Sequence, residues 1–222
     1  MNARSINKNL IPWKQDNNNV KIASLNCMNL KNSHNDIIHD KTLMESTLIA
    51  LSETWLELDT TWTGINGYKS HYNSIGPGKG LALYYKDKTF HPVTDIKTEK
   101  LQISKLTSTE LDVIVVYRTA QGSSLELKEH LANLISPEVT TIVCGDFNIC
   151  YFSNKNNRVT QFLEANEFVQ LVTESTHIKG GHIDHVYFKP GKNTKENPSI
   201  FRYSPYYSDH DAICATIKIH EE

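Results

Sequence analysis

The chain has 222 residues, of which 39% are hydrophobic and 22% are charged, and its formal net charge is −2 at pH 7. No apolar run approaches the roughly 20 residues that a membrane helix needs, and the polar segment after Met1 lacks the apolar region of a signal peptide. A charge so close to zero excludes a nucleic-acid partner held by the field of the whole molecule, so such a partner would need a local patch or a metal.

The chain carries no repeat, low-complexity tract or linker that would divide it. We therefore expect residues 1–19 to form a polar, flexible leader and residues 20–222 to form a single domain. Cys27, Cys144 and Cys214 lie in apolar strand-like runs and have no partner at zinc-ligand spacing. This pattern predicts buried, reduced thiols in an intracellular protein.

Apolar, β-branched runs predict many short strands, interrupted by a few amphipathic helices. Helices are predicted at residues 36–46, 124–135 and 157–168, with Asn35-Asp36 and Ser123 or Ser124 as caps of the first two. The Gly-rich turn at residues 76–80 leads into a strand, which favours a hairpin tip over a phosphate-binding loop. Strands are predicted at residues 20–26, 48–55, 68–73, 81–85, 101–107, 111–117, 140–144, 170–176, 183–188, 200–203 and 212–219. This succession predicts an α/β sandwich.

Polar side chains gather at the ends of these strands. If the strands lie side by side, the ends converge on one edge of the structure. The groups are Asn26, Glu53, Tyr117-Arg118, Asp146 with Asn148, Asp184-His185 and Ser208-Asp209-His210.

The chemistry available to these groups is limited. Glu53 and Asp209, with Asn26 as a neutral oxygen ligand, suit a hard cation such as Mg2+. His210 with Asp184 suggests an imidazole oriented by a carboxylate. Asp146 and Asn148 would align and deprotonate a water. Together the groups predict hydrolysis of a phosphate ester.

Each group alone has an ordinary structural explanation. A Glu at a strand end is usually a solvated carboxylate, and a lone Asp-His is more often a surface pair than a catalytic one. Asn26 could cap a turn and Tyr117 could fill a strand face. The order of six motifs along one chain is what favours the functional interpretation.

That order resembles the endonuclease/exonuclease/phosphatase superfamily, from about Val20 to the C-terminus. Three of the motifs most resemble endonuclease domains of LINE-type retrotransposons and related mobile elements. These are residues 52–56, Ser-Glu-Thr-Trp-Leu; residues 180–185, Gly-Gly-His-Ile-Asp-His; and residues 207–210, Tyr-Ser-Asp-His.

The resemblance implies a four-layer α/β sandwich, with two mostly antiparallel sheets packed face to face and flanked by helices. It implies a Mg2+-dependent cut, with Mn2+ as a substitute, that leaves a 3′-hydroxyl and a 5′-phosphate. Glu53 would bind the metal with help from Asn26 and Asp209. The remaining implied roles are water orientation by Asp146 and Asn148, support of His210 by Asp184, and phosphate contact by Tyr117, Ser208 and Thr176. Arg118 is a further candidate for phosphate contact.

Departures from the superfamily pattern narrow the substrate class. Cys27 and Met28 follow Asn26 where abasic-site endonucleases often carry a carboxylate, which disfavours specialised abasic-site repair. The only His-Leu pair, His130-Leu131, falls in a predicted helix rather than a strand, which disfavours the deoxyribonuclease-like and sphingomyelinase-like branches. The residues after Tyr117 also lack the proline common at that position, which leaves the geometry of that loop open.

We therefore expect an endonuclease that nicks one strand of duplex DNA, for insertion of a mobile element by target-primed reverse transcription. The expected partner is double-stranded DNA, with no membrane, and the expected state is a monomer in the nucleus, compatible with fusion to a reverse transcriptase or helicase. The alternatives are a phosphatase or phosphodiesterase acting on phosphoinositides, sphingomyelin or DNA-end adducts, and a binding module without activity.

Overall fold

The computed structural model describes residues 19–57, 62, 64–86, 89–154, 156–192, 194 and 197–218. Residues 1–18 of the predicted leader lie outside this part of the chain, and Asn19 is the first residue of a strand. No helix in the described residues is long and apolar enough to span a membrane.

Two six-stranded sheets make up most of the structure. In the first sheet the strand order is β11-β12-β1-β2-β4-β3, and only β1 and β2 run parallel. The bounds of its strands are β1 Asn19–Asn26, β2 Leu48–Ser52, β3 Lys69–Asn73, β4 Leu81–Tyr85, β11 Ser199–Tyr203 and β12 Ala212–Lys218.

The second sheet has the order β5-β6-β7-β8-β10-β9, and only β7 and β8 run parallel. Its strands are β5 His91–Lys97, β6 Leu101–Thr107, β7 Leu111–Arg118, β8 Thr140–Asp146, β9 Val169–Gln170 and β10 Asp184–Lys189. Both sheets are therefore mostly antiparallel, as predicted.

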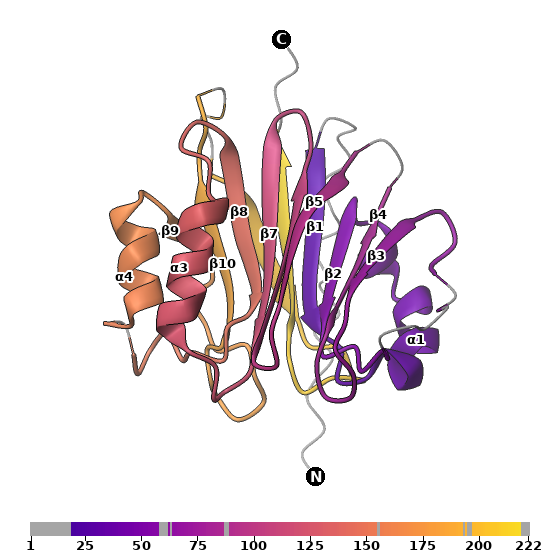
Figure 1. Cartoon of the computed structure of the whole chain (residues 1–222). Coiled ribbons are helices and arrows are strands. Elements are labelled where there is room, and N and C mark those ends of the chain that lie inside the picture. The colour runs from indigo at the N-terminus through magenta and orange to yellow at the C-terminus, as the bar shows by residue number, and fades with distance from the viewer. Residues whose placement is uncertain are drawn as a thin grey trace.

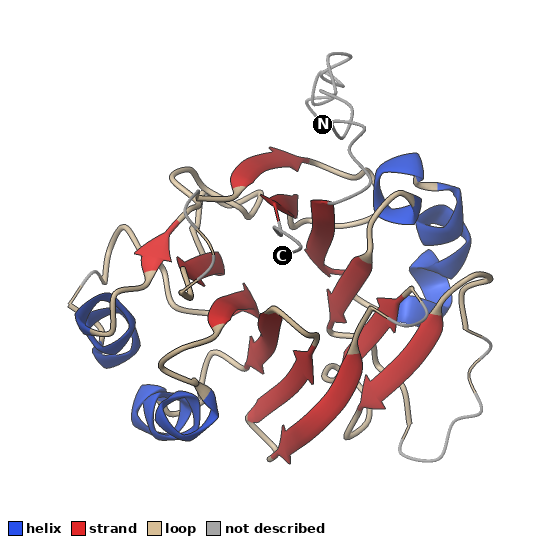
Figure 2. Ribbon diagram, turned by 90° about the horizontal axis from the view of Figure 1, so that it is seen from above, coloured by secondary structure: helices blue, strands red, loops and turns tan. Residues whose placement is uncertain are grey.

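Helices cover the outer face of each sheet. Figure 1 shows α3, Ser124–Leu134, and α4, Arg158–Ala165, on the side of the second sheet, with α1, Leu30–His39, on the opposite side. The short α2, Lys41–Met44, follows α1. Figure 2, seen from above, shows the two pairs of helices at opposite flanks with the strands between them. The predicted four-layer α/β sandwich is confirmed.

Strand β8 shows how the sequence encodes these layers. Alternate side chains of a strand point to opposite faces of its sheet. Ile142 and Cys144 accordingly belong to the core between the two sheets, whereas Val143 packs in the core beneath α3 and α4. Because both faces are covered, the strand reads as an uninterrupted apolar run. Cys27, Cys144 and Cys214 are buried free thiols, as predicted.

The first helical region differs from the prediction of one helix at residues 36–46. The side chain of Asn29 accepts hydrogen bonds from the backbone amides of Lys31 and Asn32, and α1 begins six residues earlier, at Leu30. Asp40 then ends α1, and its side chain caps α2. A residue that leaves helical geometry to cap the next helix divides the region into two helices.

One predicted strand is shorter than expected, and one observed strand was not predicted. The predicted strand at residues 170–176 is reduced to β9, because the Gln170 side chain accepts hydrogen bonds from the amides of Val172 and Val186 and takes the chain out of the ladder. The edge strand β5 was not predicted, because most of its residues are exposed and it contains Pro92.

Candidate active site

The site lies where the strands with polar ends terminate. The parallel pairs place Asn26 beside Ser52 and Tyr117 beside Asp146, while Asp184 lies opposite Asp146. A hydrogen bond from Asn26 Nδ2 to Asp146 Oδ2, 2.9 Å long, joins the two sheets at this edge. In Figure 1 the edge is at the bottom, where β1 leads to α1.

Asp146 is the most enclosed carboxylate of the site, with 1% of its surface exposed. Its Oδ2 accepts hydrogen bonds from Asn26 and from Asn148 Nδ2, and its Oδ1 accepts one of 2.9 Å from the backbone amide of Asn148. Burial raises the pKa of Asp146 to about 8, and the charge of Asp184 adds to this. The protein thus orients Asp146 by three donors and makes it an unusually strong base for a carboxylate.

The backbone around Asp146 requires particular residues. Gly145 has φ 127°, and a Cβ there would lie 2.0 Å from the carbonyl oxygen of Val116 on the neighbouring strand. Only glycine avoids that overlap. Asn148 has φ 49°, a left-handed conformation that asparagine tolerates better than most residues.

Arg118 supports the same turn through its guanidinium. It is 5% exposed, and its guanidinium donates to the carbonyl oxygens of Phe147, at 2.6 Å, Asn148, at 2.7 Å, and Gly122. Asn148 Nδ2 in turn donates to the carbonyl oxygen of Arg118. These contacts give Arg118 a role in holding the Asp146–Asn148 turn, and its contact with a phosphate stays a prediction.

A buried chain of hydrogen bonds connects Thr176, Asp184 and His210. The Thr176 hydroxyl donates to Asp184 Oδ2 at 2.7 Å, and His210 Nδ1 lies 2.8 Å from the same oxygen. Burial alone would lower the pKa of His210, but the hydrogen bond and charge of Asp184, with the charges of Asp146 and Asp209, raise it to about 9. The structure therefore brings Asp184 and His210 together as the sequence suggested. Phosphate contact by Thr176 stays a prediction, because its hydroxyl hydrogen is used by Asp184.

Glu53 and Tyr117 meet at the open side of the site. The Tyr117 hydroxyl lies 3.3 Å from Glu53 Oε1 and 3.1 Å from the carbonyl oxygen of Gly78, in the predicted hairpin tip. Burial and the charges of Glu53 and Asp146 raise the pKa of Tyr117 well above its usual range. Tyr117 is therefore a neutral phenol that can donate a hydrogen bond.

The loop before β12 supplies Ser208 and Asp209. The Ser208 hydroxyl donates to the carbonyl oxygen of Asn26 and accepts from the amide of His210, so it ties this loop to the end of β1. Phosphate contact by Ser208 stays a prediction. Asp209 Oδ2 lies 3.2 Å from His177 Nε2. His177 was not predicted, because its place beside His210 comes from an isolated bridge between two loops.

The residues present suit a divalent cation. Asp209 Oδ1 is a buried oxygen that accepts no hydrogen bond from the described part of the chain. In the part of the chain that the structure describes, metal-ligating atoms within 4.8 Å of one another occur in two groups, His177 with Asp209 and His210, and Asp146 with Asp184 and His210. Glu53 belongs to neither group, but it is only half-buried and its carboxylate faces Tyr117. Carboxylate oxygens with spare capacity are the ligands that Mg2+ and Mn2+ prefer.

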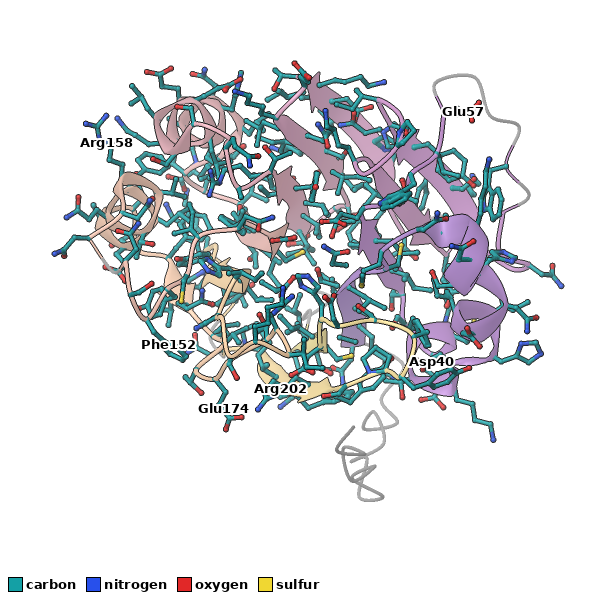
Figure 3. The ribbon with its side chains drawn as sticks, turned by 90° about the horizontal axis from the view of Figure 1, so that it is seen from below. Asp40, Glu57, Phe152, Arg158, Glu174 and Arg202 are labelled. Carbon is teal, nitrogen blue, oxygen red and sulfur yellow. The ribbon has the colours of Figure 1, made fainter. Side chains whose placement is uncertain are left out.

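Other polar groups near the site have structural partners. His185, whose pKa burial lowers to about 3, stacks on Phe147, and its Nε2 donates a hydrogen bond of 2.8 Å to the carbonyl oxygen of Ile149. Arg202 pairs with Glu174 and Asp211, and Figure 3, which views the site edge from below, shows Arg202 and Glu174 next to each other.

Comparisons with known proteins agree with this fold. The model of the endonuclease/exonuclease/phosphatase family matches residues 23–210. No curated protein sequence matches the chain.

Solved structures with the same fold include three nucleic-acid enzymes. An AP endonuclease from Archaeoglobus fulgidus is 15% identical, with a TM-score of 0.70, over 90% of this chain and 100% of that chain. The endonuclease domain of TRAS1, a telomere-specific non-LTR retrotransposon, is 12% identical, with a TM-score of 0.66, over 90% and 98%. TDP2 of D. rerio, complexed with a single-stranded DNA product, is 14% identical, with a TM-score of 0.64, over 90% and 99%.

Proposed function

The chain belongs to the endonuclease/exonuclease/phosphatase family, and on that premise we propose that it is an endonuclease that nicks one strand of duplex DNA. Members of this family are hydrolytic nucleases and phosphodiesterases that generally depend on a divalent metal. The proposed products are a 3′-hydroxyl and a 5′-phosphate, and the proposed cofactor is Mg2+, with Mn2+ as a substitute.

One observation carries the proposal. Asp146, held by Asn26 and Asn148, lies at the same edge as the Asp184–His210 pair and as Glu53. A base, an oriented imidazole and a half-buried carboxylate at one edge are the parts that hydrolysis of a phosphodiester requires.

Each group then has a role. Asp146 accepts a proton from the attacking water, and Asn148 orients that water. His210, with its Nδ1 on Asp184, presents Nε2 to the phosphate, and Tyr117 donates a hydrogen bond to a phosphate oxygen. Glu53, Asn26 and Asp209 would hold the metal, which supplies positive charge next to the developing negative charge of the phosphate.

Exposed apolar side chains support DNA as the substrate. Met28 and Trp55 follow Asn26 and Glu53 by two residues and are 43% and 39% exposed. An exposed indole beside a phosphate site can stack on a base or pack on a sugar, whichever sequence the DNA has. A phosphoinositide headgroup has no base on which the indole could stack.

We extend the proposal to the biological setting. The motifs shared with mobile-element endonucleases and the similarity to the TRAS1 domain support a role in mobile-element insertion by target-primed reverse transcription. In that setting the chain acts on double-stranded DNA in the nucleus, as a monomeric domain that can be joined to a reverse transcriptase or helicase.

Cleavage of supercoiled plasmid, followed by mapping of the nicked ends, tests the proposal. We expect nicked circles with Mg2+ or Mn2+, none with EDTA, and a loss of at least about 10²-fold in rate for Asp146→Ala and His210→Ala. Asp112→Asn is the matched control, because Asp112 is a buried carboxylate paired with Lys105 near the start of β7, at the opposite end of that strand from Tyr117. Intact plasmid with both metals, or variants that nick as fast as the wild type, would contradict the proposal.

A second candidate is hydrolysis at DNA ends that carry an adduct, which the similarity to D. rerio TDP2 favours. A 5′-adducted oligonucleotide distinguishes it from the first. Release of the adduct without any nicking of closed circular DNA would decide for this candidate.

A further inference from the structure

A short loop segment pairs with the loop that carries Asp209 and His210. The amide of Ile178 donates to the carbonyl oxygen of Asp209 at 2.9 Å, and the amide of Asp211 donates to that of Thr176 at 2.7 Å. Between these bonds, His177 and His210 are opposite each other as an antiparallel bridge. Their rings meet edge to face, with centroids 4.7 Å apart.

The two neighbouring residues of this segment each contact a different carboxylate of the site. Thr176 donates to Asp184, and His177 Nε2 lies 3.2 Å from Asp209 Oδ2. The side chain of His177 is 13% exposed and that of Asp209 is 32% exposed, so the imidazole approaches the carboxylate from its more buried side. His210 lies between the two carboxylates.

The backbone determines which nitrogen of His177 carries the proton. The amide of Lys179 donates to His177 Nδ1 at 3.1 Å, so Nδ1 must present a lone pair. The proton of the neutral imidazole is then on Nε2, the atom that faces Asp209. His177 is therefore held as a hydrogen-bond donor to Asp209.

We propose that His177 is a positioning residue that holds the Asp209 carboxylate for the reaction. The bond uses Oδ2 and leaves Oδ1, which accepts no other hydrogen bond from the described residues and lies 3.7 Å from His210 Nε2. The oxygen that faces His210 is thereby aimed at the place where the phosphate and the metal would lie. The inference rests on the proposed function, because it assigns the support of one of its residues.

A role for His177 as a metal ligand fits less well, although His177, Asp209 and His210 are close enough to share an ion. A ligating imidazole usually donates its other N–H to a carboxylate or carbonyl. His210 has this arrangement through Asp184, whereas His177 Nδ1 accepts a hydrogen bond from the backbone amide of Lys179. Coordination of a metal by His177 Nε2 would put the proton of the neutral imidazole on Nδ1. That N–H would then face the backbone N–H of Lys179.

Kinetics of two variants test the positioning role. His177→Leu removes the donor, and we expect kcat for plasmid nicking to fall about 10- to 100-fold with KM changed less than about threefold, as for the loss of a hydrogen bond to a charged group. His177→Gln keeps an N–H donor at nearly the same place, and we expect it to recover most of kcat. In the Asp209→Asn background, His177→Leu should cost little more, because the two residues act as one unit. Independent, multiplying effects, or an effect on KM alone, would overturn the proposal.

A readout without cleavage separates this inference from the proposed function. Long-range 1H–15N spectra of the metal-free wild type should show His177 protonated at Nε2 and not at Nδ1, and Asp209→Asn should shift that Nε2–H signal. Protonation at Nδ1 would overturn the positioning role. Loss of the Nε2–H signal on addition of Zn2+, a diamagnetic divalent cation used in place of Mn2+, would also overturn it. If the wild type cleaves no DNA, the proposed function fails, and with it the catalytic part of the inference. The spectra would still decide whether His177 holds Asp209.

Discussion

One half of the candidate site is buried and the other half is open to solvent. Asp146, Asp184 and His210 are 1%, 3% and 6% exposed. The side chain of Asp209 is 32% exposed, and Glu53 is half-buried. All of these groups lie at the same edge of the two sheets, so the difference arises from the loops around them.

The hydrogen bonds differ in the same way. Asp146 and Asp184 Oδ2 accept bonds from several donors of the chain, which a buried charge needs. Asp209 Oδ1 accepts none from the described residues, and the Glu53 carboxylate accepts a long one of 3.3 Å from Tyr117. The buried half is thus organised by the protein itself, whereas the open half keeps oxygens available for an ion and a substrate.

Asp184→Asn should have the largest effect, because it breaks the buried half. The amide cannot supply the charge that orients His210 and raises its pKa. We expect kcat for plasmid nicking to fall about 10³- to 10⁴-fold with little change in KM. Asp112→Asn, at the other end of β7, should stay within a few-fold of wild type. Equal losses of kcat in both variants would show that neutralising any buried carboxylate impairs the protein. The buried half of the site would then have no special role in catalysis.

The pH dependence of stability should show the next largest effect. His210 has a pKa raised from 6.5 to about 9, so the folded state binds its proton more tightly than the unfolded state does. Its contribution is fully present below pH 6.5 and is lost as the pH rises through 9, with an upper value of about 3 kcal/mol. Asp146, whose pKa is raised to about 8, also lowers stability as the pH rises, because its charged form is disfavoured in the folded state.

Urea unfolding of metal-free protein between pH 6 and pH 9.5 measures this effect. The free energy of unfolding of the wild type should fall over this range, and that of His210→Gln should fall less. Parallel curves for the two proteins would show that His210 is not held by the buried carboxylates. Asp209→Asn, in the open half, should flatten the curve less than His210→Gln does.

Trp55→Ala should have the smallest effect, because it changes only the open rim. We expect KM for duplex DNA to rise about fivefold with kcat nearly unchanged, as for the loss of about 1 kcal/mol of stacking. Val93→Ala is the control, since Val93 is also exposed but lies on the edge strand β5. A fall in kcat instead would place Trp55 in the support of Glu53, and unchanged kinetics would remove it from DNA binding.

The same contrast explains how far the sequence could predict the fold. Strands covered on both faces, such as β7 and β8, are mostly apolar, and their bounds were predicted to within two residues. β2 is also apolar and begins at Leu48 as predicted, but it ends at Ser52, three residues before the predicted end. β5 is exposed along most of its length, so no apolar pattern identifies it. The start of α1 was missed for a similar reason, because only Leu30, Ser33 and Ile37 of this helix are buried.

The candidate site was predictable where a polar residue ends an apolar strand. Asn26 and Asp146 are such residues, and they meet although 120 positions separate them. His177 could not be predicted, because it lies in an irregular segment and its pairing with His210 depends on the tertiary fold. The partners of Arg118 could not be predicted either. All three hydrogen bonds go to backbone carbonyls, which every residue has, so no residue type in the sequence identifies them.

The pairing of β12 with β1 has a consequence for the folding of the chain. β12, close to the C-terminus, lies between β11 and β1, and Ser208 reaches the carbonyl oxygen of Asn26 across 182 positions. Contacts between such distant residues give a high contact order, which slows folding. During synthesis the first sheet stays incomplete until β12 has left the ribosome. Until then, the edge of β1 that pairs with β12 has no partner strand. The candidate site is therefore complete only after β12 has paired with β1, because that pairing brings the loop with Ser208 to the end of β1.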